Sequence, residues 1–355
     1  MKYIPALDGL RGYAVLLVLL QHWLGNDHFL NFFNNGLIGV SLFYVLSGFL
    51  ITGILLKNKG ASLDVKTQLK NFWARRMLRI FPIYYLLLLI LVLIGFQDIR
   101  QQLLYFASYT QNILFYSSNQ NFGYLIHFWS LAIEEQFYLI WPILILLIRL
   151  DRIFVLILLT ITAGIFFRLS AHMGILNIAV NPINYHLMGS IDLFGYGAFL
   201  AFISSHSQHT IKKVWIFMGS MLAVILSVKL LINHLDYLSL IGVLAVGLIF
   251  LVIHFQHLLI KRIFCNAPII RLGKISYGVY LIHYFMYPFN HWLHELCISN
   301  QLKWPFFDVI LIPEFSNIYL RFVYFLFLTL FFSVLSWYII EKPFLNLKSR
   351  FAYAK

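Results

Sequence analysis

The chain has 355 residues, of which 61% are hydrophobic and only 11% are charged. A soluble domain carries about 25% charged residues, so this composition excludes a water-soluble globular protein and predicts an integral membrane protein. The net charge of +13 gives no reason to expect nucleic acid as a partner, because most of the basic residues flank apolar runs, where they would set the membrane topology.

Long apolar runs recur from residue 10 to residue 340, and no polar stretch between them is long enough for a separate soluble domain. About 20 apolar residues cross the hydrocarbon core of a bilayer. By this criterion we predict spans at residues 10–25, 36–56, 80–96, 129–148, 153–171, 186–203, 214–232, 238–256, 273–291 and 318–340. The expected fold is therefore all-α, a single polytopic membrane domain over residues 1–355 with about ten transmembrane helices.

The positions of the 26 lysines and arginines predict the orientation of these helices. Most of them fall at the two ends of the chain and in alternate connecting segments. The positive-inside rule places such segments in the cytoplasm, so both termini are predicted to be cytoplasmic. In this topology Cys265 and Cys297 lie on opposite sides of the membrane, and no disulfide is expected.

The first predicted helix carries two ionisable side chains, Arg11 and His22, at or near bilayer depth. Eleven residues bring the helix to within about 20° of three full turns, so the two side chains share a face and lie about 16 Å apart along it. A charged side chain in hydrocarbon costs about 2.5–3.5 kcal/mol on insertion scales. We therefore expect this face to line a polar cavity in which His22 is a general base and Arg11 binds an anion. The alternative is that Arg11 reaches the inner head groups and His22 is an interfacial residue.

Three arginines, Arg75, Arg76 and Arg79, precede the third predicted span. Residues three and four apart share a helix face, so these guanidinium groups can converge on one polyanion. They predict a cytoplasmic phosphate site that would suit a nucleotide-bearing donor such as coenzyme A. The alternative is a basic flank that binds lipid head groups.

Acidic side chains also fall inside predicted spans. Such residues are rare unless they are paired or face water. Glu134 and Glu135 leave two interpretations open: an ion pair that joins two helices, or a carboxylate that contacts His22 or Arg11 and orients the base. The sequence does not distinguish the two glutamates, and we take Glu134 as the candidate. Asp192 likewise leaves open a functional role and an internal ion pair.

Six segments follow one another between residues 7 and 344: LDGLRGYAVLLVLLQHW, FYVLSGFLIT, RMLR at 76–79, HFWSLAIEEQFYLIWP, GKISYGVYLIHY and SWYIIEKPF. In this order they resemble the acyltransferase-3 family of membrane acyltransferases, which modify bacterial surface and secreted glycans. Matched by position, His22 corresponds to the catalytic histidine of that family and Arg11 to its essential companion. Arg76 and Arg79 correspond to a cytoplasmic arginine pair.

The resemblance implies a ten-helix O-acyltransferase in the bacterial inner membrane, with acetyl-CoA as donor and a hydroxyl of an envelope glycan or lipid-linked sugar as acceptor. Lipopolysaccharide O-antigen, capsule, exopolysaccharide and peptidoglycan all remain open as acceptors, as does an acyl group longer than acetyl. No metal is expected, membrane lipids are the other partner, and no oligomeric state is predicted. Some family members carry a fused hydrolase-like domain with a Gly-Asp-Ser nucleophile; this sequence shows none and resembles the stand-alone form.

Two chemical routes stay open at this point. His22 either removes a proton from the acceptor hydroxyl or carries the acyl group itself as an acyl-histidine. The alternative function is a polytopic transporter or flippase that uses the intramembrane His, Arg and Glu side chains as its path. A structural or accessory subunit of an envelope assembly would tolerate the loss of His22.

Overall fold

The computed structural model describes residues 3–59, 63–118, 122–176, 183–206, 210–232, 236–255, 257–299 and 317–351. All regular elements in these ranges are helical, which confirms the all-α prediction. The long helices are α1 (Pro5–Leu24), α2 (Asn35–Asn58), α3 (Val65–Leu93), α7 (Phe128–Leu147), α8 (Leu150–His172), α9 (Leu187–His206), α10 (Thr210–Ile232), α11 (Tyr237–His254), α13 (Ala267–Ile282), α14 (Met286–Ser299) and α16 (Ile318–Ser336). Short helices connect them: α4 (Gln97–Gln101), α5 (Leu103–Ala107), α6 (Gln111–Ser117), α12 (Leu258–Phe264) and α17 (Lys342–Asn346).

Eight helical stretches of the described chain are long and apolar enough to cross a membrane. They are Phe29–Asn58, Val65–Leu93, Gly123–Leu147, Leu150–His172, Leu187–Ser205, Ile211–Ile232, Tyr237–His254 and Ile318–Arg350. The other two predicted spans, on α1 and on α13 with the 3-10 turn and helix that follow it, are not among these eight stretches. Helix α1 carries the charged residues Asp8 and Arg11 in its first two turns, and α13 is only 16 residues long. The total of about ten spans and the cytoplasmic termini stay predictions.

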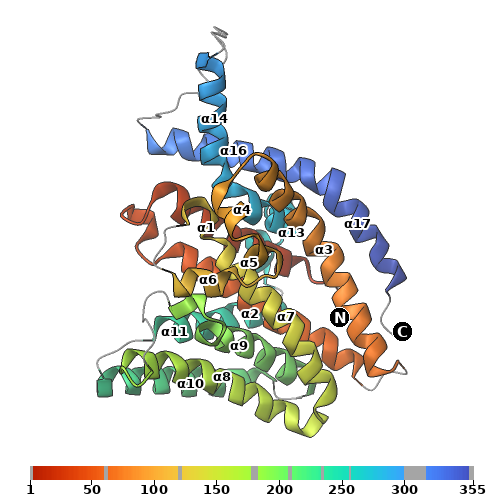
Figure 1. Ribbon diagram of the computed structural model, residues 1–355. Coiled ribbons are helices and arrows are strands. Elements are labelled where there is room, and N and C mark those ends of the chain that lie inside the picture. The colour runs from red at the N-terminus through yellow and green to blue at the C-terminus, as the bar shows by residue number, and fades with distance from the viewer. Residues whose placement is uncertain are drawn as a thin grey trace.

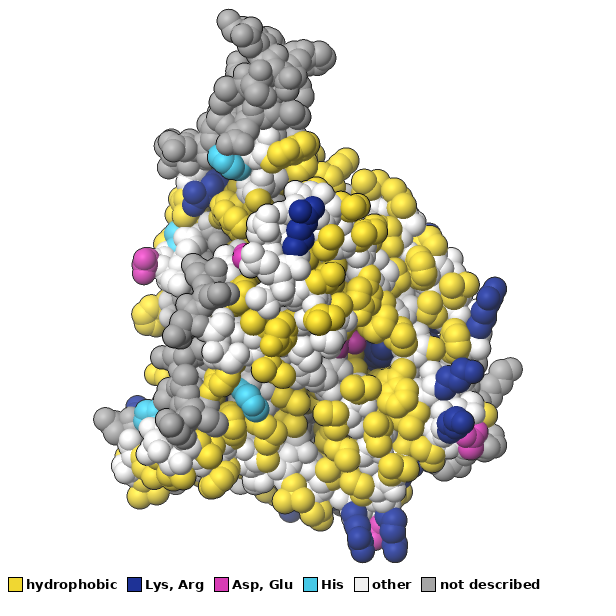
Figure 2. Space-filling model, viewed as in Figure 1, with side chains coloured by type: hydrophobic (Ala, Val, Ile, Leu, Met, Phe, Trp, Pro, Cys, Tyr) yellow, Lys and Arg dark blue, Asp and Glu magenta, His cyan; other side chains and the backbone are white. Residues whose placement is uncertain are grey.

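The surface agrees with a membrane setting (Figure 2). Hydrophobic side chains cover most of the visible face, and the Lys and Arg side chains gather mainly along its right and lower right edge. Acidic and basic side chains are also visible at the bottom of a hollow in this face. The bundle therefore has a largely apolar surface on this face and charged side chains in its interior.

Helix α1 lies at the centre of the bundle, between α2 on one side and α13 on the other (Figure 1). Helices α8 to α11 form a group beyond α2, and α3 and α16 lie on the opposite side (Figure 1). Small residues allow the closest crossings. A Cβ atom on Gly48 of α2 would stand 2.1 Å from the carbonyl oxygen of Phe194 in α9, and one on Gly273 of α13 would stand 1.7 Å from that of Asp8. The tight crossing of α1 with α13 brings the functional residues of both helices together.

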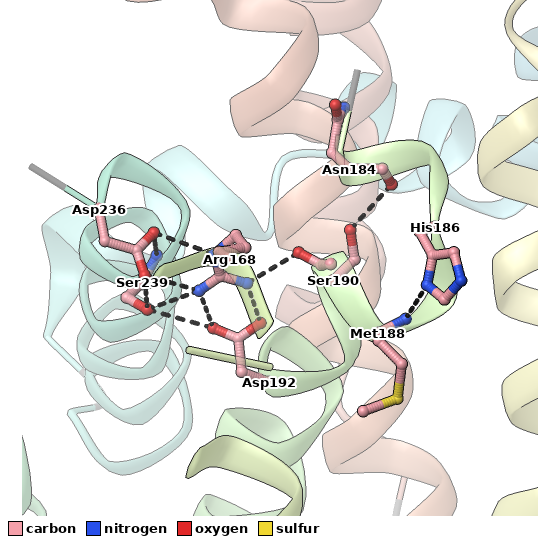
Figure 3. A network of polar contacts seen from close by, with 9 residues as sticks. Arg168, Asn184, His186, Met188, Ser190, Asp192, Asp236 and Ser239 are labelled. Carbon is pink, nitrogen blue, oxygen red and sulfur yellow. Dashed lines mark hydrogen bonds and ion pairs between the residues drawn. The ribbon is translucent and has the colours of Figure 1, made fainter. Parts of the chain in front are cut away.

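A buried ion network joins α8, α9 and α11 (Figure 3). The guanidinium of Arg168, which is 5% exposed, donates to both oxygens of Asp192 at 2.7 and 2.8 Å. It also donates to Asp236 at 2.8 and 3.2 Å and to the hydroxyl of Ser239 at 2.8 Å. Asp192 is therefore part of an internal ion pair, the second of the two interpretations left open by the sequence. A buried charge is tolerated only when it is paired and hydrogen-bonded in this way.

Candidate active site

A polar cavity of about 70 Å³ lies between helices α1, α2, α3, α7 and α13. Its charged lining consists of Arg11, Arg76, Arg79, Glu134 and Glu135, which come from α1, α3 and α7. Hydroxyl groups supply most of the remaining polar lining: Tyr44, Ser47, Tyr109, Ser130, Tyr138, Ser276, Tyr277 and Tyr280. Of the six predicted site residues, Arg11, Arg76, Arg79 and Glu134 meet here, although the first and last are separated by 123 positions in the chain.

The three arginines predicted to bind phosphate, Arg75, Arg76 and Arg79, differ in their surroundings. They lie on one continuous helix, because α3 begins at Val65, well before the predicted span. The guanidinium of Arg76 lies 4.9 Å from the ring centre of Tyr138. In the described part of the chain, neither Arg76 nor Arg79 forms a salt bridge. Arg75 is not in the cavity wall: it donates at 3.0 and 3.1 Å to the carbonyl oxygens of Lys348 and Phe351. The cavity thus holds two of the three arginines expected to bind phosphate.

Arg11 is tied to the N-terminal end of its own helix. Its guanidinium lies 3.3 Å from the carboxylate of Asp8, and that carboxylate accepts a hydrogen bond of 2.8 Å from the hydroxyl of Tyr3. Burial, together with the Asp8 carboxylate, raises the pKa of Tyr3 to about 12. Tyr3 therefore stays a hydrogen-bond donor at neutral pH, and Arg11 is held where it faces the cavity.

The carboxylate of Glu134 accepts hydrogen bonds from the hydroxyls of Ser47 and Tyr138. The hydroxyl oxygens of Ser47 and Tyr138 also lie 2.9 Å from each other. Within the described residues these bonds connect Glu134 to Ser47 and Tyr138 and not to His22, while Glu134 shares the cavity lining with Arg11. Glu134 organises the wall of the cavity beside the arginines, because α7 directs it toward α2 and α3 rather than toward the end of α1.

The hydrogen-bond partner of His22 is another histidine. Nδ1 of His22 lies 2.7 Å from Nε2 of His283, a residue of the 3-10 turn His283–Phe285 that follows α13. Nδ1 of His283 in turn lies 2.6 Å from the carbonyl oxygen of Tyr280. The ring of Tyr284 lies 4.3 Å from that of His22. His283 belongs to the segment GKISYGVYLIHY, and a histidine inside the predicted span 273–291 was the available signal.

A layer of hydrogen-bonded hydroxyls separates the cavity from the histidine pair. Tyr280 and Ser130 line the cavity and bond to each other at 2.5 Å. The Tyr280 hydroxyl also donates to the carbonyl oxygen of His127 at 3.1 Å, and its ring centre lies 5.6 Å from that of His283. His22 itself is not in the cavity lining. Arg11 therefore lines this cavity and His22 does not, although the shared helix face predicts one cavity for both.

The C-terminal part of the bundle contributes one more carboxylate near the arginines. Glu341 ends a π-helix, Trp337–Glu341, and is 2% exposed. It accepts a 3.4 Å hydrogen bond from Ser336 and interacts electrostatically with Arg79. Single π-helical turns are frequent at functional sites. Among the residues that the structure describes, no three His, Cys, Asp or Glu side chains form a group that could hold a metal ion.

A family model described as an acyltransferase domain, that of acyltransferase family 3, matches residues 4–345. The chain belongs to the acyltransferase-3 family. All of the residues that line the cavity, the histidine pair and Glu341 lie within the matched segment. The resemblance noted in the sequence is thereby confirmed.

Relatives within the acyltransferase-3 family include the "Peptidoglycan O-acetyltransferase OatA" of Listeria monocytogenes. It is 32% identical over 317 residues, which cover 80% of this chain and 49% of the relative. A Staphylococcus aureus strain COL protein named "Putative O-acetyltransferase" is 29% identical over 91% of this chain and 57% of its own length. This chain therefore spans about half the length of these relatives. No solved structure matches the chain.

Proposed function

We propose that this chain is a membrane O-acyltransferase that moves an acyl group, acetyl in the first instance, from cytoplasmic acyl-CoA to a hydroxyl of an envelope glycan. One observation carries the proposal. Arg76 and Arg79, which form no salt bridge within the described ranges, line a cavity together with Tyr280, and the backbone of Tyr280 holds the histidine that bonds His22. A polyanion site and an imidazole base thus lie next to each other inside the bundle.

In this proposal the donor phosphates bind to Arg76 and Arg79. Arginine suits this role because its planar guanidinium forms paired, charge-assisted hydrogen bonds with phosphate oxygens. Arg11 neutralises charge deeper in the cavity. A volume of about 70 Å³ holds a few water molecules but not coenzyme A, so the donor has to open the cavity. Breaking the hydrogen bond between Tyr280 and Ser130 would connect it with His22.

The chemistry then follows one of two balanced routes. In the first, Nε2 of His22 takes the proton of the acceptor hydroxyl while the hydroxyl oxygen attacks the thioester carbonyl; the carbon–sulfur bond breaks, and coenzyme A leaves as a thiol with the proton that His22 returns. In the second, Nε2 attacks the thioester and coenzyme A leaves as a thiolate. The acyl-histidine then passes the acyl group to the hydroxyl, whose proton neutralises the thiolate.

The acceptor is proposed to approach from the side of His22 that carries three exposed or partly exposed tyrosine rings. Tyr284 lies against His22, and the rings of Tyr124 and Tyr287 lie nearly parallel with centres 6.1 Å apart. Aromatic faces with hydroxyl groups suit contact with sugar rings. The name of the Listeria relative makes peptidoglycan the first acceptor to test. The inner membrane, cytoplasmic termini and a role for Glu134 in shaping the donor cavity belong to the same proposal.

The test compares envelope glycans from cells that express the wild-type chain with those from cells that lack it. Mass spectrometry should show an acyl-sized increment that the wild type adds and that His22→Ala does not add, at equal levels of membrane-inserted protein. His254→Ala is the matched control, because His254 is exposed and lies on α11, away from the cavity. Full acylation by His22→Ala would remove His22 from the chemistry. Movement of acyl groups across the membrane without transfer to a hydroxyl would favour a transporter.

A further inference from the structure

The contact between His22 and His283 has a well-defined geometry. The two rings are parallel to within 3°, their centres are 5.0 Å apart, and Nδ1 of His22 lies 2.7 Å from Nε2 of His283. Parallel rings that stacked face to face would keep their atoms about 3.5 Å apart or more. The rings therefore lie edge to edge in nearly one plane, so that an N–H of one ring points directly at the lone pair of the other.

The backbone decides which ring donates. A carbonyl oxygen can only accept, so Nδ1 of His283 must carry the proton that it shares with the carbonyl oxygen of Tyr280 at 2.6 Å. In a neutral His283 the other nitrogen, Nε2, is then an acceptor. Nδ1 of His22 must be the donor to it, which leaves Nε2 of His22 without a proton. His283 is 0% exposed, and in the described part of the chain no carboxylate contacts either ring, so a charged His283 would be unpaired and buried.

The bare Nε2 is the ring nitrogen of His22 that His283 does not contact. His22 is partly exposed, and its Nε2 forms no hydrogen bond with any residue that the structure describes. Gly36 of α2 lies beside it: a Cβ atom on Gly36 would stand 4.0 Å from Nε2. The same Cβ atom would stand 3.1 Å from Cγ of Gln21, so Gln21 and Gly36 form the protein surface next to this nitrogen.

We propose that His283 is the positioning residue for His22, holding it as the Nδ1–H tautomer with the Nε2 lone pair directed at the substrate. This rests on the proposed function. His283 does here what a carboxylate does in a Ser-His-Asp triad: it fixes the ring, sets the tautomer and accepts the hydrogen bond of the imidazolium as it forms. The carbonyl oxygen of Tyr280 accepts a hydrogen bond from Nδ1 of His283 and thereby fixes the tautomer of His283. Because His283 in turn fixes the tautomer of His22, the backbone at the end of α13 sets the tautomer of a side chain on α1.

Neighbouring residues do not offer the same contact. His127 lies close to the pair, with ring centres 5.1 Å from His283, but its Nε2 lies 3.4 Å from the carbonyl oxygen of Leu281 and its Nδ1 has no partner among the described residues. Glu134 is bonded to Ser47 and Tyr138. His283 is thus the residue that the geometry assigns to this role.

The first test observes the wild-type chain and uses a variant only to assign the signals. Magic-angle-spinning NMR of the full chain in liposomes, labelled with ¹⁵N only at histidine, should show His22 protonated at Nδ1 and bare at Nε2. A correlation across the hydrogen bond should join its Nδ1 to a bare Nε2 of His283. The His22 signals are identified by their loss in His22→Gln. A wild-type spectrum in which His22 is protonated at Nε2 would overturn the proposal.

The second test uses two substitutions that imitate one ring nitrogen each. The amide of glutamine reaches the position of Nε2 and that of asparagine reaches the position of Nδ1, so only His283→Gln can accept the hydrogen bond from His22. We expect His283→Ala and His283→Asn to lower kcat by about 100-fold or more, the scale of lost general-base catalysis. His283→Gln should recover at least about tenfold of that loss. KM for acetyl-CoA should stay within about twofold in all three, because donor binding lies beyond the hydroxyl layer.

The outcomes separate the two proposals. If His22→Ala is inactive but all three His283 variants transfer like the wild type, the positioning role of His283 fails and the proposed function stands. If His283→Gln is as inactive as His283→Asn while both bind acetyl-CoA normally, the acceptor at Nε2 is the wrong assignment. If His22→Ala itself retains full transfer, the proposed chemistry fails, and with it the reason for positioning His22.

Discussion

Replacing Arg79 with glutamine should weaken binding of the donor, while the same change at Arg75 should not. The two residues lie one helical turn apart on α3, and the sequence assigns both to a phosphate site. In the structure Arg79 lines the cavity, whereas Arg75 is bonded to the carbonyl oxygens of Lys348 and Phe351. The pair therefore forms a matched comparison in which charge, residue type and helix are constant, while the position along the helix and the hydrogen-bond partners differ.

The magnitude follows from what Arg79 contacts. In the described residues Arg79 forms no salt bridge, and Glu341 interacts with it electrostatically without a direct bond. A phosphate would therefore be the first group to form charge-assisted hydrogen bonds with this guanidinium. A charge-assisted hydrogen bond contributes about 1.5–3 kcal/mol, and about 1.4 kcal/mol corresponds to a factor of ten in an equilibrium constant. The Kd for acetyl-CoA should rise about 10- to 150-fold in Arg79→Gln. Arg75→Gln should change it by about twofold or less, as expected for a substitution outside the site.

The assay is calorimetric titration of the purified protein in detergent with acetyl-CoA and, separately, with S-acetylpantetheine, which lacks the nucleotide phosphates. Arg79→Gln should lose affinity for acetyl-CoA only, because a phosphate contact has no counterpart in the shorter ligand. Equal losses for both ligands would mean that Arg79 shapes the cavity rather than binding phosphate. Equal losses of acetyl-CoA affinity in Arg75→Gln and Arg79→Gln would refute the distinction drawn from the geometry.

Three further predictions concern the scaffold and the cavity wall. Arg168→Met should lower the free energy of unfolding by about 3–5 kcal/mol, because it leaves two buried carboxylates unpaired. Asp192→Asn should lower it by less, because Arg168 stays paired with Asp236. Thermal unfolding in detergent checks this order, and equal losses would refute it. Gly48→Ala should destabilise the protein by about 1–3 kcal/mol, because the new Cβ atom would stand 2.1 Å from a backbone oxygen. Gly219→Ala has open space around the new Cβ atom and should be neutral or stabilising. Thermal unfolding in detergent measures both variants. Glu134→Gln keeps an oxygen that can accept from Ser47 and Tyr138, so glycan acylation should fall by about fivefold or less, the worth of one hydrogen bond; a loss as large as that of His22→Ala would show that the charge itself takes part.

The sequence by itself determined the helical class and the positions of most helices. Eight of the predicted spans coincide with helices that can cross a membrane, because a bilayer requires each spanning segment to satisfy its own backbone hydrogen bonds and to be apolar over a fixed length. Both conditions are local and can be tested in a sequence window. The family could be recognised for a similar reason, since its motifs are short, ordered runs of residues. The two spans that failed the same criterion lie on α1 and α13, the helices that carry His22 and lead into His283.

Only the tertiary structure decided which polar groups meet. His22 and His283 are separated by 261 positions, and Asp192 finds its partner Arg168 on a different helix. Ion pairs and hydrogen bonds depend on the rotation of each helix and on the direction of each side chain, and a sequence window contains neither. The same reason explains why Glu134 contacts Ser47 instead of His22, and why Arg75 leaves the cavity that Arg79 lines. The length of an apolar run identifies each helix separately. The geometry of a site depends on several helices and is determined only when they pack together.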